Sequence, residues 1–144
     1  MNGGEYKSLD DIFEKIMKYK NYIYPNGGVT VTGGEPLLQV KFLIELFEKL
    51  KKENIHTCID TSGMVALTDD IKKLLSLTDL VLLDIKHIDS KKCKNLIGFN
   101  NERELAFARY LSDNNIHMWI RQVLVPGYTD DEQDLLKLKD FISS

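Results

Sequence analysis

Two glycines and a glutamate, Gly33-Gly34-Glu35, stand directly after a short run of β-branched residues and directly before a proline. Glycine leaves the main chain open to a close ligand, and a carboxylate attracts a positively charged group. These three residues together could therefore bind an ammonium group. Their position between an expected strand and an expected helix is also where parallel α/β proteins bind ligands.

Three further sets of polar residues accompany apolar runs later in the chain. Asp60 and Thr61 close one run, Asp84 and Lys86 close the next, and Arg121 lies inside a fourth. Carboxylate and hydroxyl oxygens suit a hard cation, whereas lysine and arginine suit a ligand carboxylate. A ligand that carries both an ammonium and a carboxylate group, such as an amino acid or its derivative, would use the whole set.

Each of these residues also has a purely structural explanation. The two glycines could simply turn the chain, Asp60 could cap a turn, and Lys86 could be the first solvated residue after a strand. Arg121 is harder to explain in this way, because a charge inside an apolar strand needs a partner. The occurrence of four such sets at four expected strands favours a ligand pocket.

The elements that must position these residues follow from hydrophobic periodicity. Apolar and β-branched runs predict four strands, over residues 29–32, 55–61, 79–86 and 116–125. Helical spacing predicts helices over residues 8–20, from Pro36 through Leu50, from Thr68, over 102–114, and through Ile142 behind a capping box of Thr129 and Glu132. We expect Ser8 to cap the first helix and a turn at residues 24–28. Strand–helix alternation predicts a parallel sheet, either doubly wound or part of a (β/α) barrel.

Composition excludes several classes of function. The 144 residues suit one domain, and a net charge of −3 with a pI near 5.6 gives no reason to expect nucleic acid or an anionic membrane as partner. We find no membrane-length apolar stretch and no signal-peptide core, so we expect a cytoplasmic protein. Cys58 and Cys93 form no C-x-x-C pair, and we interpret Cys58 as a small core residue.

Five segments give the sequence a family resemblance: GGVTVTGGEPLLQ, HTCIDTSG, TDLVLLDIKHID, NLIGFNN and WIRQVLVPGYTDD. In this order they resemble the radical S-adenosylmethionine activases of glycyl-radical enzymes, over nearly the whole chain from about Asn2. The resemblance implies an α/β fold: a partial (β/α) barrel of the radical S-adenosylmethionine type. Its four parallel strands would alternate with helices and be open at both ends. Residues 1–144 would form a single incomplete core domain.

The resemblance also implies roles for the polar residues. By position, the Gly33-Gly34-Glu35 turn would hold the amino group of S-adenosylmethionine, and Lys86 would reach its carboxylate. Arg121 matches an arginine that lines the cofactor pocket. The resemblance assigns no catalytic residue to this chain.

A monovalent cation beside the cofactor carboxylate is a further implication of the resemblance. Asp60, Thr61, Asp84 and the main-chain carbonyl of Leu82 match the family's cation site. Residues 86–101 match a loop that the family associates with the protein substrate.

The implied reaction needs a [4Fe–4S] cluster as a second cofactor. Reductive cleavage of S-adenosylmethionine at the cluster would give a 5′-deoxyadenosyl radical, which takes a hydrogen from a backbone glycine of a partner such as pyruvate formate-lyase. The implied electron donor is flavodoxin or ferredoxin. The family's C-x-x-x-C-x-x-C ligand motif does not occur in these 144 residues. We therefore expect an enzyme fragment that is inactive by itself.

Three alternatives remain open at this stage. The chain could belong to an activase of anaerobic ribonucleotide reductase, or it could be a non-catalytic remnant that binds S-adenosylmethionine or a protein partner. A third alternative is an aldolase-like barrel that uses a desolvated Lys86 as a Schiff base. For an open barrel we also expect Val31, Ile59 and Leu83 to face an exposed interior and the chain to self-associate.

Overall fold

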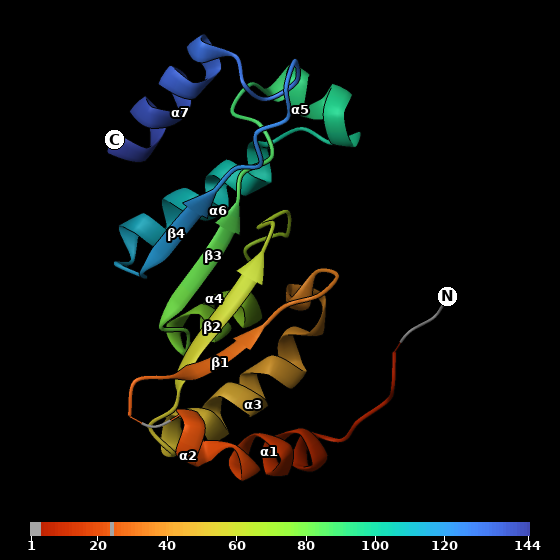
Figure 1. Cartoon of the computed structure of the whole chain (residues 1–144), viewed down its shortest axis with the longest axis vertical. Helices are drawn as coiled ribbons and strands as arrows, with labels where there is room; N and C mark the ends of the chain where they lie inside the picture. Colours follow the sequence, from red (N-terminus) through yellow and green to blue (C-terminus); the bar gives the residue numbers. More distant parts are fainter. Residues whose placement is uncertain (1–3, 24) are drawn as a thin grey trace.

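Four parallel strands form one sheet in the computed structural model, which describes residues 4–23 and 25–144 (Figure 1). The strands are β1 (Gly28–Val31), β2 (His56–Thr61), β3 (Leu80–Asp84) and β4 (Met118–Arg121). Their order in the sheet is β1-β2-β3-β4, so every strand pairs with its neighbour in the sequence. The expected α/β class, the parallel pairing and the open sheet are thus confirmed, with β1 and β4 at the two edges.

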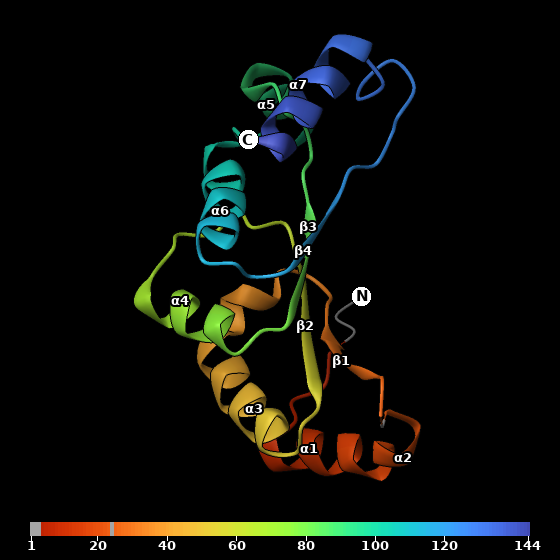
Figure 2. The same ribbon diagram turned by 90° about the vertical axis from the view of Figure 1, so that its left-hand side faces the viewer.

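The helices lie on one side of this sheet and beyond its ends. They are α1 (Leu9–Lys18), α2 (Lys20–Ile23), η1 (Pro36–Gln39), α3 (Val40–Lys52), α4 (Asp69–Ser76), α5 (Ser90–Ile97), α6 (Glu102–Asp113) and α7 (Glu132–Ser143). Figure 2 shows α3, α4 and α6 on one face, while α5 and α7 lie past the carboxyl ends of the strands. Across the two described ranges, none of the helices combines the length and the apolar character that crossing a membrane requires.

Alternation along the strands decides which side chains meet the helices. Ile59 of β2 and Leu83 of β3 are fully buried and belong to the hydrophobic core. The prediction that these two side chains face an exposed interior was therefore wrong, and Val31 is partly buried against the same core. Because successive side chains of a strand point to opposite faces, Asp60 and Asp84 take the face without helices.

Most element boundaries agree with the prediction within two residues, and the exceptions have local causes. Ser8 caps α1 in a full capping box with Asp11, and Thr68 caps α4 through its side chain. The helix expected over residues 8–20 ends at Lys18, and a short second helix follows Tyr19. Of the turn expected at residues 24–28, Tyr24 lies outside the described residues.

The carboxyl-terminal part of the chain holds the larger corrections. The strand expected through Val125 ends at Arg121, because Asp84, its partner in the register, is the last residue of β3. Asp131, not Thr129, caps α7, since the Thr129 hydroxyl donates to Val123 O at 2.7 Å and accepts from the main-chain N–H of Val125 at 2.7 Å.

Candidate functional site

The predicted site residues meet at the carboxyl ends of the strands. Glu35 follows β1, Asp60 and Asp84 lie at the ends of β2 and β3, and Arg121 is the last residue of β4. Parallel strands of one sheet end at a common edge, and side chains from separate parts of the sequence therefore converge there.

Arg121 joins the two aspartates into one charged cluster. Its Nε donates to Asp84 Oδ1 at 3.0 Å, and its Nη2 forms an ion pair with Asp60 Oδ1. The Lys86 Nζ lies 3.4 Å from the other Asp84 oxygen, Oδ2. The bond to Asp60 is the main reason that the pKa of the Arg121 guanidinium is raised. Two carboxylates and two cations thus share a partly exposed surface, where they are available to a zwitterionic ligand.

Glu35 is held by residues at the end of β2. Its Oε1 accepts from the Thr61 hydroxyl at 2.6 Å and from the main-chain N–H of Leu37 at 3.2 Å. Its Oε2 accepts from the Ser62 hydroxyl at 2.7 Å and from the Ser62 main chain at 3.1 Å. These four bonds fix the carboxylate in one orientation beside the glycine turn. Ser62 was missed as a site residue, although its hydroxyl directly follows the strand end.

Gly33 and Gly34 expose their main chain. Both adopt left-handed conformations, with φ of 93° and 53°, which glycine tolerates better than any other residue. Apart from the glycine itself and its two chain neighbours, a Cβ built on either glycine would have no atom of the described residues within 4 Å. The main chain is therefore accessible to a ligand, as an ammonium-binding turn requires.

The side chains expected at a cation site lie on both faces of the sheet. The Thr61 side chain is buried and turned toward Glu35, whereas Asp60 and Asp84 lie on the other face of the sheet. Arg121 already pairs with both aspartates. In the described part of the chain, no group of three His, Cys, Asp or Glu side chains is placed to hold a metal ion. The structure thus brings together the two carboxylates but does not add the threonine hydroxyl.

A buried glutamate that sequence reasoning missed lies beneath Lys86. Glu104 of α6 is fully buried, and its Oε1 accepts the main-chain N–H of Lys86 with an N···O distance of 2.5 Å. Burial raises the pKa of Glu104 to about 7, although the bond from Lys86 acts in the opposite direction. The signal was present in the sequence, because Glu104 stands three and four residues before the buried Phe107 and Ala108, on the apolar face of its helix.

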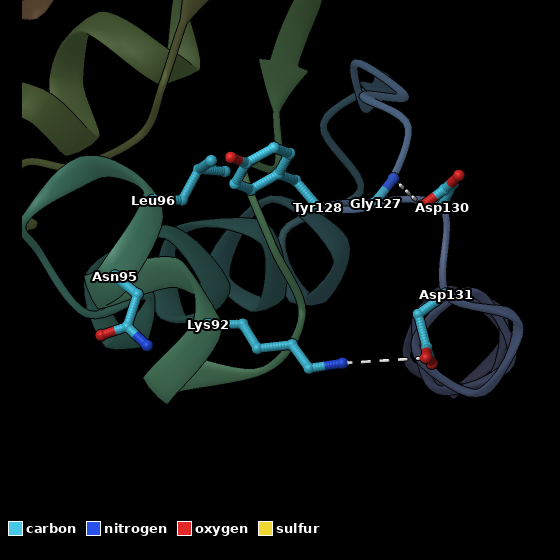
Figure 3. A pocket seen from close by; sticks show the side chains of 7 residues that line it. All are labelled: Lys92, Asn95, Leu96, Gly127, Tyr128, Asp130 and Asp131. Atoms are coloured by element: carbon cyan, nitrogen blue, oxygen red, sulfur yellow. Dashed lines mark hydrogen bonds and ion pairs between the residues drawn. The ribbon is translucent and has the colours of Figure 1, made fainter.

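Residues 86–101 contain a helix, α5, where the resemblance implied a loop. Lys92 of α5 forms an ion pair with Asp134 of α7. The Lys92 Nζ also lies 3.9 Å from Asp131 Oδ2 (Figure 3). The bonds from Lys137 and Lys92 lower the pKa of Asp134 to about 2. A cavity of about 460 Å³ lies between α5 and the loop before α7; Lys92, Asn95 and Leu96 of the 86–101 segment line it, but none of the predicted cofactor-binding residues does.

The two cysteines do not fit an iron–sulfur cluster. Cys58 on β2 and Cys93 in α5 are both buried free thiols on different elements. Burial raises the pKa of both thiols, which disfavours the thiolate form that binds iron. These two cysteines therefore do not form a cluster site.

Comparisons with known proteins confirm the family resemblance. The sequence model of the radical SAM superfamily matches residues 1–138. Pyruvate formate-lyase-activating enzymes of Staphylococcus aureus strains USA300 and NCTC 8325 are each 50% identical to this chain in an alignment of 143 positions, gaps included, that covers 95% of this chain and 57% of theirs. The chain thus spans little more than half the length of these curated relatives.

Solved structures agree with this assignment. A domain of pyruvate-formate lyase-activating enzyme from Bacteroides vulgatus ATCC 8482 superposes with a TM-score of 0.75 at 29% identity, over 83% of this chain and 73% of that one. Streptococcus suis SuiB bound to S-adenosylmethionine superposes with a TM-score of 0.77 over 98% of this chain and 32% of that one. At 20% identity, this second likeness concerns the fold alone.

Proposed function

This chain belongs to the radical SAM superfamily, and on that premise we propose that it forms the cofactor-binding part of an enzyme that activates a glycyl-radical enzyme. The observation that carries the proposal is the convergence of an open glycine turn, a fixed glutamate and the Asp60–Arg121–Asp84 cluster at one end of the sheet. The full activity belongs to a protein of the length of the relatives, and this chain supplies one part of it.

The residues present suit the methionine end of S-adenosylmethionine. The accessible main chain of Gly33 and Gly34 and the Glu35 carboxylate would accept hydrogen bonds from its ammonium group. The Lys86 ammonium and the Arg121 guanidinium would face the carboxylate of S-adenosylmethionine. This carboxylate would compete with the Asp84 carboxylate for the two cations. When bound and reductively cleaved, the cofactor supplies a 5′-deoxyadenosyl radical.

Three side chains, those of Thr61, Ser62 and Arg121, fix the site before the ligand binds. Thr61 and Ser62 orient Glu35, so that the ammonium group would meet a carboxylate already in place. Arg121 ties the ends of β2, β3 and β4 together through its two aspartates. Groups held in advance lose less conformational freedom on binding, and the affinity is correspondingly higher.

The protein partner and the electron donor belong to the same proposal. The relatives' names support pyruvate formate-lyase as the partner that receives the glycyl radical. Helix α5 would contribute to its binding, and flavodoxin or ferredoxin would deliver the electron. An anaerobic ribonucleotide reductase is the alternative partner.

The Schiff-base alternative is not supported by the surroundings of Lys86. A lysine of that kind is normally desolvated, whereas the Lys86 side chain is 36% exposed and lies beside the Asp84 carboxylate.

Titration calorimetry with S-adenosylmethionine tests the proposal. Glu35→Ala and Asp84→Ala should each weaken the affinity about tenfold or more, as expected for charge-assisted hydrogen bonds. Asp69→Ala, a change at a fully exposed aspartate of α4, is the matched control and should leave the affinity unchanged. Unchanged binding in both site variants would place the ligand elsewhere on the molecule and refute the proposed site.

A further inference from the structure

Lys86 is the point at which the chain leaves the sheet at the site. The last main-chain bond between β3 and β4 in this region runs from Ile85 N to Arg121 O, at 2.9 Å. The next amide, that of Lys86, donates instead to a side chain, Glu104 Oε1 of α6, at 2.5 Å. Glu104 thus holds the main chain two residues beyond the end of β3, between Asp84 and the loop toward α5.

The surroundings of Glu104 make a carboxylate costly there. The Glu104 side chain is fully buried, and within the described residues its Oε2 has no hydrogen-bond partner. A buried polar atom without a partner destabilises the folded state, and more so if it is charged. Phe107 and Leu111 on the same helix are fully buried apolar residues, so an apolar side chain would suit this face. The hydrogen bond to the Lys86 amide is the one contact that an apolar side chain at position 104 could not make.

We propose that Glu104 is a positioning residue: by holding the Lys86 main chain from below, it fixes Lys86 and Asp84 in the arrangement that receives the methionine end of S-adenosylmethionine. Glu104 lies on the helix side of the sheet, whereas Asp84 lies on the open side, so the glutamate acts through the main chain and touches no ligand. This role rests on the proposed function, because it concerns the same cofactor site.

Three variants separate positioning from simple stability. Glu104→Met fills the space without an acceptor, and Glu104→Gln keeps a weaker acceptor of the same shape. Leu111→Ala is the control, because it removes buried apolar volume from the same helix and leaves the contact to Lys86 intact. All three are compared with the unsubstituted chain at one pH and one temperature.

The first measurement is independent of any ligand. Amide hydrogen exchange by NMR should show a protected Lys86 amide in the unsubstituted chain and in Leu111→Ala. In Glu104→Met this amide should exchange about tenfold faster or more, because its acceptor is gone. Equal protection of the Lys86 amide in Glu104→Met and in the unsubstituted chain would overturn the contact itself.

The second measurement compares two ligands by calorimetry. S-adenosylmethionine should bind Glu104→Met about tenfold more weakly and Glu104→Gln about threefold more weakly, following the strength of the acceptor. 5′-Methylthioadenosine lacks the methionine ammonium and carboxylate, so its affinity should stay the same in all variants. Leu111→Ala should bind both ligands like the unsubstituted chain.

The outcomes distinguish the two proposals. Absence of S-adenosylmethionine binding by the unsubstituted chain refutes the proposed function, and the positioning role falls with it. Normal binding by Glu104→Met together with a fast-exchanging Lys86 amide refutes the positioning role alone. Equal weakening of both ligands would mean a general loss of structure and also contradict it. If Glu104→Met does not fold, the affinity and exchange of Glu104→Gln decide the same question.

Discussion

Arg121 of β4 pairs with Asp60 of β2, although β3 lies between these two strands. The same guanidinium donates to Asp84 of β3, so one side chain bridges the ends of three strands. Asp84 stands opposite Arg121 in the register, while Asp60 stands opposite Leu82. The arginine therefore reaches diagonally across the open face, and it occupies the carboxylates that a cation would need.

Replacing Arg121 should make the two aspartates available to a cation. Arg121→Ala leaves Asp60 and Asp84 without their shared counter-charge, and potassium should then raise the Tm by about 2–4 °C, equivalent to about 1 kcal/mol. The unsubstituted chain should melt at the same temperature in potassium chloride and in choline chloride of equal ionic strength. If potassium raised the Tm of both proteins equally, the two aspartates would hold a cation even with Arg121 in place, and the prediction would be wrong.

Removing the Glu35 carboxylate should destabilise the fold as well as weaken the ligand. Glu35→Ala leaves the buried Thr61 hydroxyl and the Ser62 main chain without their acceptor, at a cost of about 2 kcal/mol. Urea unfolding measures this loss, and Glu35→Gln should recover about half of it, because its amide oxygen replaces only one of the two carboxylate oxygens. Full stability of Glu35→Ala would mean that these four bonds add nothing to the fold.

The pKa of Glu104 predicts that stability falls as the pH rises toward neutrality. The pKa is about 7 in the folded chain and 4.5 as the ordinary value. Below about pH 4.5 both states hold the proton, whereas between pH 4.5 and 7 the folded state holds it and the unfolded state has lost it. Raising the pH through this window should cost up to about 3 kcal/mol.

Glu104→Gln is the variant that tests this pH dependence, because it cannot titrate. Its free energy of unfolding should fall less than that of the unsubstituted chain between pH 5 and pH 7.5. Asp134 does not interfere, since its lowered pKa of about 2 changes stability only below about pH 4. Parallel pH profiles for the two proteins would show that Glu104 is not protonated in this range.

The open face of the sheet predicts self-association of the isolated chain. Trp119 of β4 is 66% exposed, and β1 and β4 present unpaired strand edges. Sedimentation should show dimers or larger species at high concentration, and Trp119→Ser should shift them toward monomer. Tyr22→Ser, at a similarly exposed aromatic residue on α2, is the control and should have no effect. A monomer at all concentrations would contradict the prediction.

Periodicity and strand-end chemistry were sufficient to predict the sheet and the meeting of several polar side chains at one of its edges. The four strands were recognisable because each is a short apolar run, and the convergence of Glu35, Asp84 and Arg121 follows from parallel pairing alone. The face of the sheet on which each side chain lies was harder to predict. Runs such as that of β3 are apolar on both faces, so their pattern does not show that Leu83 points to the helices and Leu82 away from them.

Contacts made by single side chains could not be predicted. Helix α5 was missed because only Cys93 of its eight residues is buried, so it lacks an apolar stripe. Thr129 followed by Glu132 has the spacing of a capping box, but its hydroxyl is used inside the preceding loop. The Glu104 contact joins residues 18 positions apart and depends on how α6 packs on the sheet.

The strand order β1-β2-β3-β4 has a consequence for how the chain is built during synthesis. Every strand pairs only with the strand that precedes or follows it in the sequence, so no strand waits for a distant partner. The unit of β1, α3 and β2 can close as soon as it leaves the ribosome, and β3 and then β4 can add to its free edge in turn. Growth in one direction leaves β1 at one edge throughout and moves the other edge outward with each added strand, and this second edge is where a nascent chain of this type would need protection by a chaperone.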